Sequence, residues 1–153
     1  DVSGDYVITD VPYVLGDVLT VFIDDETLNG AIVTIAGTPA ALTGMNVYAN
    51  HMIVRNEGSG STTNANLDTG NNADTDLTAL YADGSTTTVT LVAGVDLLVW
   101  TGDTYAPGGP VNANGDIVIN GTVTAASSDF FVADDWINAG TFTPGTATVF
   151  FVG

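Results

Sequence analysis

The sequence predicts an all-β fold, and among all-β folds a β-solenoid of the single-stranded, right-handed β-helix type. Three segments, beginning at Asp96, Asp116 and Asp135, each open with an aspartate and a short apolar run. The last two segments then continue in the same way, into a glycine and a Thr-apolar-Thr strand. A repeat of roughly 20 to 30 residues built only of strands and turns is typical of a solenoid, which buries its core between successive coils.

Composition supports the same fold class. The chain has 153 residues, which suits one domain over 1–153, and 45% of them are hydrophobic, so a sizeable core can form. Val, Ile and Thr fit a pleated surface, and Gly and Asn fit tight turns. No stretch has a helical period that predicts a long helix. The alternative is a β-sandwich, in which neighbouring strands would pair antiparallel instead of parallel.

The first 36 residues contain three short β runs separated by turn signals, at 6–8, 18–23 and 31–36. Asn29-Gly30 is a strong turn signal, because both residue types tolerate positive φ. Residues 45–55 fit a strand better than a helix, although 40–48 could form a short helix. Strands are expected again between 77 and the end of the chain, above all at 86–92 and 146–152.

One low-complexity stretch interrupts this pattern, at residues 57–76. It contains Leu67 as its only large apolar side chain. A stretch of this composition is expected to form a long polar loop that projects from the coil and contributes nothing to the core. Loops of that length are usually functional or mobile.

The charge balance excludes two classes of partner. Eighteen acidic residues face a single arginine and no lysine, for a formal net charge of −17. Nucleic acids and anionic membrane surfaces are bound by clustered Lys and Arg, so neither is an expected partner. No apolar run approaches the roughly 18 residues of a membrane span, so membrane insertion is not expected. The acids, nearly all Asp, are expected at turns, where they keep the protein soluble.

Residues 136–153 have the sequence WINAGTFTPGTATVFFVG. This segment resembles a repeat found in large bacterial secreted and surface proteins, in which W-x-N-x-G-T-F precedes G-T-x-T-V-x-F-x-G. The resemblance is good over 129–153, looser over 96–128 and faint before that. It implies a β-helix or adhesin-like stalk segment without catalytic residues. Absence of cysteine excludes disulfides, and the Thr-, Asn- and Gly-rich strands favour an extracellular or cell-surface location. The matching positions are Trp136, Asn138, Gly140, Thr141, Phe142, Gly145, Thr146, Thr148, Val149, Phe151 and Gly153.

The polar stretch also contains a cluster of oxygen-bearing side chains. Ca²⁺ takes six to eight oxygen ligands from Asp, Asn and backbone carbonyls. The spacing differs from that of an EF-hand loop, which requires a bidentate Glu at its twelfth position. Two interpretations stay open, a solvated polar loop and a calcium site that rigidifies the fold, and no other cofactor is expected. The candidate ligands are Asp68, Asn71, Asn72, Asp74 and Asp76.

The residue types present favour a protein without a catalytic site. His51 is the only histidine and Arg55 the only strong cation, so a base with a partner is hard to assemble. Arg55 is expected to neutralise an acid, inside the fold or across a subunit contact. A polysaccharide-active enzyme is the third alternative, because Asp24, Asp25 and Asp134 could be presented as paired carboxylates from neighbouring coils.

Aromatic side chains gather in the C-terminal half of the chain, which leaves two interpretations. They could fill a solenoid core in ladders, or they could stack on the sugar rings of a glycan. The second interpretation makes the protein a carbohydrate- or surface-binding adhesin module. Asn120 begins an Asn-Gly-Thr glycosylation sequon.

The favoured function follows from the two ends of the chain. An apolar strand is expected near each end, with no visible capping helix, and bare solenoid ends favour edge-to-edge association. Contact between the first strand of one copy and the last strand of another is heterologous, and such contacts give filaments when they do not close. The sequence therefore predicts an extracellular structural subunit that assembles head to tail with copies of itself. Donation of a terminal strand is a variant, and a slice of a longer stalk is the competing explanation. The expected interface residues are Tyr6, Val7, Ile8, Val149, Phe150, Phe151 and Val152.

Overall fold

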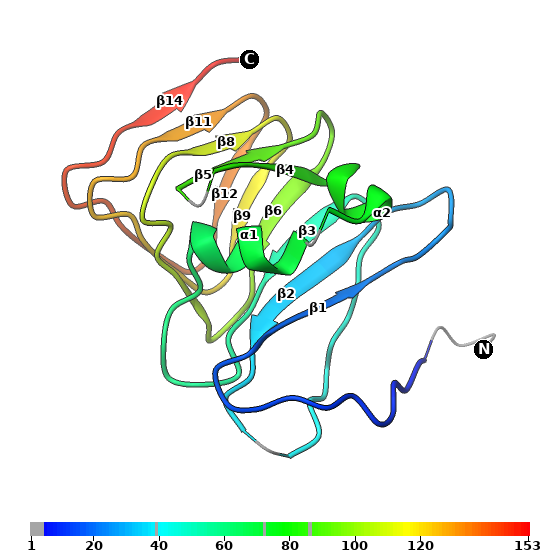
Figure 1. Cartoon of the computed structure of the whole chain (residues 1–153). Helices are drawn as coiled ribbons and strands as arrows, with labels where there is room; N and C mark the ends of the chain where they lie inside the picture. The colour runs from blue at the N-terminus through cyan, green and yellow to red at the C-terminus, as the bar shows by residue number, and fades with distance from the viewer. Residues whose placement is uncertain (1–4, 39, 72, 86) are drawn as a thin grey trace.

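Short strands separated by tight turns wind into a β-solenoid with three sheets. The computed structural model describes residues 5–38, 40–71, 73–85 and 87–153. Successive coils stack along one axis, so that strands far apart in the sequence lie side by side (Figure 1). The first sheet has the order β1-β2-β3-β6-β9-β12. Its strands are Val18–Phe22, Ala31–Ile35, His51–Val54, Asp96–Val99, Ile117–Ile119 and Trp136–Asn138.

The other two sheets complete each coil. The second sheet has the order β13-β10-β7, and the third has the order β14-β11-β8-β5-β4. The strands of the second sheet are β7 Thr104–Tyr105, β10 Thr122–Thr124 and β13 Thr141–Thr143. Those of the third sheet are β4 Tyr81–Ser85, β5 Thr88–Leu91, β8 Val111–Ala113, β11 Phe130–Val132 and β14 Val149–Phe151.

Parallel pairing confirms the solenoid and excludes the sandwich. Strands β3, β6, β9 and β12 pair with one another in parallel along the first sheet, as do β8, β11 and β14 along the third. Among the described strands, antiparallel pairing occurs only between β1 and β2 and between β4 and β5. The repeat predicted from Asp96, Asp116 and Asp135 corresponds to the starts of β6, β9 and β12.

Strand register places equivalent residues of successive coils in columns. One column of the first sheet points into the core, and its members are Ala31, Met52, Leu97, Ile117 and Trp136. The next column lies on the opposite face of the sheet, and its members are Ile32, Ile53, Leu98, Val118 and Ile137. Side chains of a strand alternate between the two faces of its sheet, so both columns are apolar wherever both faces are covered.

The glycine of the repeat is required by the close approach of neighbouring coils. A Cβ on Gly121 would lie 2.1 Å from the carbonyl oxygen of Trp100, and one on Gly140 would lie 2.0 Å from that of Gly121. Both distances are far inside van der Waals contact, and the obstacle is backbone that cannot move aside. The Gly-Thr-apolar-Thr element therefore marks the corner where one coil packs directly against the next.

The polar stretch at 57–76 is not a projecting loop, and this prediction was wrong. It contains one helix, α1 (Asn64–Asn71), and the start of a second, α2 (Thr75–Thr78). Thr63 and Asn66 start α1 by reciprocal capping: the Asn66 Oδ1 atom accepts from the Thr63 N–H at 2.9 Å, and the Thr63 hydroxyl accepts from the Asn66 N–H at 3.3 Å. Leu67 is fully buried in the main core together with Leu77.

Two buried asparagines anchor α1 to the solenoid. The Asn64 amide nitrogen donates to the carbonyl oxygens of Thr87 and Pro110 at 2.8 and 3.1 Å, and its oxygen accepts from the Tyr105 hydroxyl. The Asn71 amide nitrogen donates to the Tyr81 carbonyl oxygen at 3.0 Å. These two polar side chains, which favour a loop when the sequence is considered alone, thus donate hydrogen bonds to backbone carbonyl groups beside α1.

The predicted strand at 6–8 is also absent. Residues 5–14 run alongside the solenoid without joining a described strand, and Val7 is 85% exposed. Of the predicted strand at 45–55, only β3 forms, and 40–48 contains no helix in its described part. The predicted strand at 86–92 begins at Thr86, which lies outside the described residues.

Candidate assembly surfaces

The last coil presents an open face at one end of the solenoid. Strands β12, β13 and β14 each stand at the edge of their sheet, and the edge of a strand carries N–H and C=O groups without strand partners. Several large apolar side chains of this coil reach solvent: Ile137, Phe150, Phe151 and Val152 are 45%, 41%, 68% and 57% exposed. We call the coil from 134 to 152 the open coil.

Aromatic rings form the floor of the open coil. The ring centroids of Trp136 and Phe142 lie 4.9 Å apart, and both rings meet Phe130 of the preceding coil edge-to-face, at 5.7 and 5.9 Å. On the other face of the third sheet, Phe150 stacks on Phe131 at 4.9 Å. The predicted interface residue Val149 is half-buried beside this floor. The aromatic residues of the C-terminal half therefore belong largely to ladders that continue to the open face.

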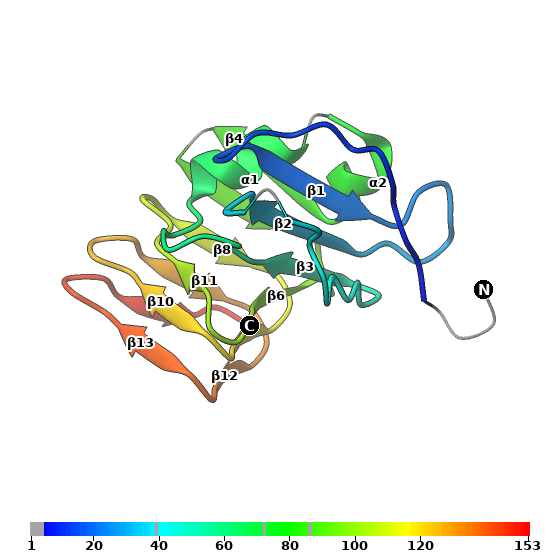
Figure 2. The same cartoon turned by 90° about the horizontal axis from the view of Figure 1, so that it is seen from below.

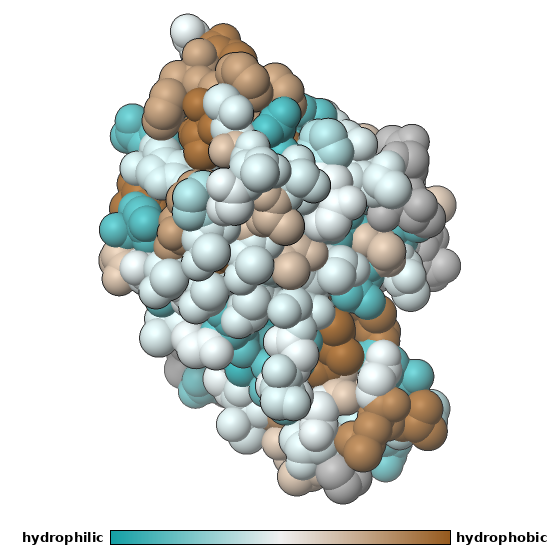
Figure 3. All heavy atoms as spheres, turned by 90° about the vertical axis from the view of Figure 1, so that its left-hand side faces the viewer, coloured by the Kyte–Doolittle hydropathy of each residue, from teal (hydrophilic) through white to brown (hydrophobic). Residues whose placement is uncertain are grey.

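A groove lies near the opposite end of the molecule. Its volume is about 780 Å³, and it runs between the N-terminal segment, β1 and residues 41–46. The predicted interface residues Tyr6, Val7 and Ile8 all line it. The Tyr6 hydroxyl donates to the Met45 carbonyl oxygen, and burial raises the pKa of this hydroxyl above its ordinary value. Figure 3 shows apolar atoms gathered toward the two opposite ends, separated by a largely hydrophilic surface.

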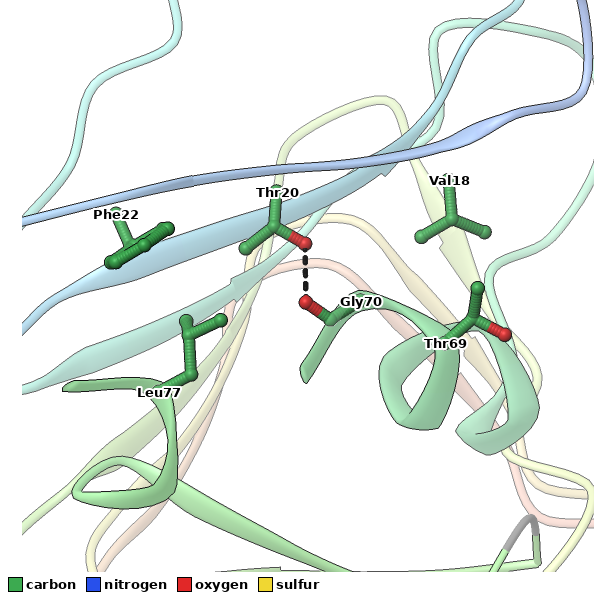
Figure 4. A pocket seen from close by; sticks show the side chains of 6 residues that line it. All are labelled: Val18, Thr20, Phe22, Thr69, Gly70 and Leu77. Atoms are coloured by element: carbon green, nitrogen blue, oxygen red, sulfur yellow. Dashed lines mark hydrogen bonds between the residues drawn. The ribbon is translucent and has the colours of Figure 1, made fainter. Parts of the chain in front are cut away.

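Helices α1 and α2 close the end of the solenoid at which the groove lies. Figure 2 shows them beside β1 and β4, at the end opposite β12 and β13. A pocket of about 320 Å³ marks the seam between β1 and the two helices, lined by Val18, Thr20, Phe22, Thr69, Gly70 and Leu77 (Figure 4). The Thr20 hydroxyl crosses this seam and donates to the Gly70 carbonyl oxygen at 2.8 Å. The sequence did not predict this cap, although the Thr63–Asn66 capping pair and the leucines at 67, 77 and 80 carry its signal.

A ladder of aspartates links successive coils along the first sheet. The Asp116 N–H donates to the Asp96 carboxylate at 2.9 Å, and the Asp135 N–H donates to the Asp116 carboxylate at 2.9 Å. The residue after each accepting aspartate donates a second bond to the next coil. The Leu97 N–H donates to the Asp116 carbonyl oxygen at 2.9 Å, and the Ile117 N–H donates to the Asp135 carbonyl oxygen at 2.9 Å. The sequence predicts these acids at turns, for solubility, and does not reveal their role in pairing the coils.

Three carboxylates from two segments meet beside α2. One oxygen from each of Asp24, Asp74 and Asp76 lies within 4.8 Å of the others. The negative charge of Asp25, then desolvation and the charges of Asp74 and Asp76, raise the Asp24 pKa above its ordinary value. Asp74 also accepts from the Asp76 N–H at 2.9 Å, and Asp76 accepts from the Asp25 N–H at 2.8 Å.

This arrangement changes the ligand set predicted for calcium. Asn71 is buried and its side-chain oxygen accepts from the Ala73 N–H, so it is a structural residue. Asp68 lies on α1, is half-buried and does not belong to the carboxylate group, and Asn72 lies outside the described residues. Asp74 and Asp76 are brought together, but with Asp24, which the prediction did not include. Calcium binding stays a prediction.

Arg55 neutralises acids inside the fold. Its guanidinium donates to the Gly44 carbonyl oxygen at 2.5 Å, pairs with Glu57 at 2.8 Å and lies 3.9 Å from Asp103. The guanidinium also lies 5.6 Å from the Trp100 ring centroid. Desolvation raises the Asp103 pKa to about 6, against the opposing effect of Arg55. The single arginine therefore links Gly44 to the carboxylates of Glu57 and Asp103.

The acids considered for catalysis lie in different parts of the solenoid. Asp24 and Asp25 lie in the connection between β1 and β2, whereas Asp134 precedes β12. His51 on β3 lies 3.6 Å from Asp96, and its Nδ1 atom lies 2.8 Å from the Ala49 carbonyl oxygen. Neither the separated acids nor the His51–Asp96 pair forms the two facing carboxyl groups that glycoside hydrolysis requires.

Comparisons with family models, with curated proteins and with solved structures found no match to this chain. Neither helix in the described part of the chain has the length and apolarity needed to cross a bilayer. Inference about function therefore depends on the surfaces themselves.

Proposed function

We propose that this protein is an extracellular structural subunit that assembles head to tail with copies of itself, without catalysing a reaction. The observation that carries the proposal is the open coil, where three edge strands and a partly exposed aromatic floor share one face. Exposed sheet edges pair readily with further strands. The apolar groove lined by Tyr6, Val7 and Ile8 lies at the other end of the molecule. Contact between the open coil and that end is therefore heterologous, and it propagates as a filament unless it closes into a ring.

Net charge sets the conditions for this assembly. Each copy carries a formal charge of −17, so copies repel one another at low ionic strength. The exposed apolar side chains at the open coil carry no charge, and Asp134 and Asp135 are its only acids. Salt screens the long-range repulsion within about 10 Å at 0.1 M, while apolar burial persists. Association is therefore expected to strengthen as salt rises.

Light scattering after size-exclusion chromatography tests the proposal over a range of protein and salt concentrations. We expect mass to rise with both. Phe151→Asp places a charge on the open coil and should abolish the rise, whereas Val92→Asp, at a 40% exposed position just after β5, is the matched control that should retain it. A monomer at all concentrations, unaffected by deletion of 146–153, would contradict the proposal.

A carbohydrate- or surface-binding role is the second candidate, and the groove favours it. The groove is of the size that accommodates a small ligand, and Tyr6, Tyr13, Asp5 and Asp10 line it. Tyrosine rings and carboxylates are side chains that pack on sugar rings and accept from their hydroxyls. A glycan array, read with and without calcium, tests this role. Binding that is lost in Tyr13→Ala, without assembly, would favour it over the structural proposal.

A further inference from the structure

We propose that residues 5–8 of one copy add to the first sheet of a second copy as the next strand beyond β12, and that the Asp135 carboxylate fixes the register. This inference rests on the proposed head-to-tail assembly and names the segment and the edge that meet. It differs from the pairing expected from the sequence, which placed the N-terminal strand against β14. The occupant of the open edge is thus the N-terminal segment of another copy.

The repeating hydrogen bonds of the aspartate ladder define what the edge of β12 can accept. Each step of the ladder has two hydrogen bonds. The N–H of an aspartate donates to the carboxylate of the aspartate one coil earlier, and the residue after that earlier aspartate donates its N–H to the carbonyl oxygen of the later one. At the open coil the ladder reaches Asp135 and Trp136. Among the described residues, nothing donates to the Asp135 carboxylate. A parallel ladder alternates its N–H groups between the two neighbours, so the Trp136 N–H faces the open edge.

The N-terminal segment carries the sequence of a ladder strand. Asp5-Tyr6-Val7-Ile8 has an aspartate followed by three apolar residues, as do Asp116-Ile117-Val118-Ile119 and Asp96-Leu97-Leu98-Val99. Both of those segments carry the ladder aspartate and the strand that follows it, β9 or β6. Residues 5–8, by contrast, belong to no strand, and Val7 and Ile8 are 85% and 59% exposed. A strand sequence that is left outside the sheets of its own copy is suited to another copy's edge.

The register set by the ladder also extends the side-chain columns. With Asp5 opposite Asp135, Tyr6 would lie over Trp136 in the inward column and Val7 over Ile137 in the outward column. The outward column is aliphatic in all five of its strands, from Ile32 to Ile137. A shift of one residue would place Val7 inward and Tyr6 outward and would misplace the aspartate, because the side-chain period of a strand is two.

The connection permits this exchange. Residues 9–17 join the donated segment to β1, which begins at Val18. Nine residues span at most about 30–32 Å when fully extended, which lets a neighbouring copy dock while β1 keeps its place. The proposed donation consists of one strand, added to the first sheet alone.

Disulfide trapping tests the register, and the absence of native cysteine gives a clean background. A mixture of two single variants, Val7→Cys and Ile137→Cys, can form a mixed disulfide only between copies. We expect this pair to cross-link efficiently. The mixture of Ile8→Cys with Ile137→Cys is the control shifted by one residue, and it should cross-link poorly. The mixture of Val7→Cys with Phe150→Cys reports docking against β14.

The outcomes separate this inference from the proposed function. Preferred Val7–Ile137 cross-linking supports the register. Assembly in light scattering with preferred Val7–Phe150 cross-linking, or with no cross-link, overturns the register but leaves the structural role. A monomer that yields no cross-link at any salt concentration overturns both.

Asp135 provides an independent measurement. Asp135→Ala removes the carboxylate and should weaken association roughly tenfold, the effect of losing one hydrogen bond to a charged group. Asp135→Asn keeps an oxygen acceptor and should stay closer to the wild type. Both variants retain the N–H that bonds to Asp116, so the melting temperature of the separated chain should be alike in the two. Equal association of all three proteins would overturn the role of Asp135.

Discussion

The two ends of the solenoid are built from the same kind of coil but are completed differently. At one end, α1 and α2 fit against β1 and β4, and Leu67 and Leu77 fill the core. At the other end, Val149 and Phe151 follow Phe130 and Val132 in register, but no further strand among the described residues stacks on them. Phe130 and Val132 are fully buried, whereas Phe151 is 68% exposed. Burial in a solenoid therefore comes from the adjoining layer more than from the residue type.

An inserted segment terminates the repeat at the capped end. Strand β3 and strand β5 lie on different sides of one coil, and the segment between them holds both helices and β4. The segment therefore caps the coil from which it emerges. The open coil has no comparable insertion: its turns between β12, β13 and β14 are short. A direct way to test this contrast is to weaken each end separately.

Leu67→Ala should give the largest effect. Leu67 is completely buried, so its truncation should lower the free energy of unfolding by about 2–5 kcal/mol. Phe151→Ala removes more atoms from the open end, yet should cost the dilute monomer less than about 0.5 kcal/mol. Urea unfolding at low protein concentration measures both changes. Equal losses at the two ends would contradict the contrast between a closed and an open end.

Asp103→Asn should change the pH dependence of stability by the next largest amount. The Asp103 pKa rises to about 6 on folding, so the folded state holds its proton more tightly than the unfolded state does. Wild-type stability should therefore fall as pH rises from about 4 through 6, by on the order of 1–3 kcal/mol from this group. The side chain is only 14% exposed, so solvent screening is limited.

The amide that replaces the carboxyl group would not titrate, so Asp103→Asn should flatten this part of the profile. Thermal melts between pH 4 and 7 measure the effect, with Asp135→Asn as a control that lies on the open coil. A profile that keeps the wild-type slope would show that another group is responsible for it.

Asn138→Ile would sharpen the description of the open end. Asn138 interrupts an inward column that is otherwise aliphatic, through Val54, Val99 and Ile119. Isoleucine would extend the apolar face and should tighten association by about 1 kcal/mol. The variant loses the 3.1 Å bond from the Gly140 N–H to Asn138. Because that N–H keeps its 2.8 Å bond to the Ile119 carbonyl oxygen, monomer stability should change little. Sedimentation equilibrium measures the association, and weaker association would count against the open coil as an interface.

Asp24→Asn should give the smallest effect, and its sign reports on calcium. Without divalent cations the variant should melt slightly above the wild type, because the carboxylates of Asp25, Asp74 and Asp76 repel Asp24. If calcium binds this group, millimolar calcium should raise the wild-type melting temperature above that in EDTA, and raise that of Asp24→Asn less. Identical wild-type melting in calcium and in EDTA would exclude the predicted calcium site.

Local sequence was sufficient for the repetitive part of the fold. The period between Asp96, Asp116 and Asp135, the Gly-Thr-apolar-Thr corners and the β-branched strands all act between neighbouring coils. Each coil therefore repeats the same local solution, and the repeat is visible without knowledge of the rest of the molecule. The solenoid and its parallel pairing were predictable for this reason.

The completion of the two ends depends on tertiary contacts that local sequence does not specify. The segment containing Asn64, Leu67 and Asn71 has a polar composition, and its burial depends on carbonyl groups of Tyr81, Thr87 and Pro110 that are distant in sequence. Residues 5–8 have the sequence of a strand, yet a strand forms only where an edge is within reach. Periodic residues contact equivalent neighbours in every coil, whereas a cap or an edge strand depends on the particular partner that it contacts.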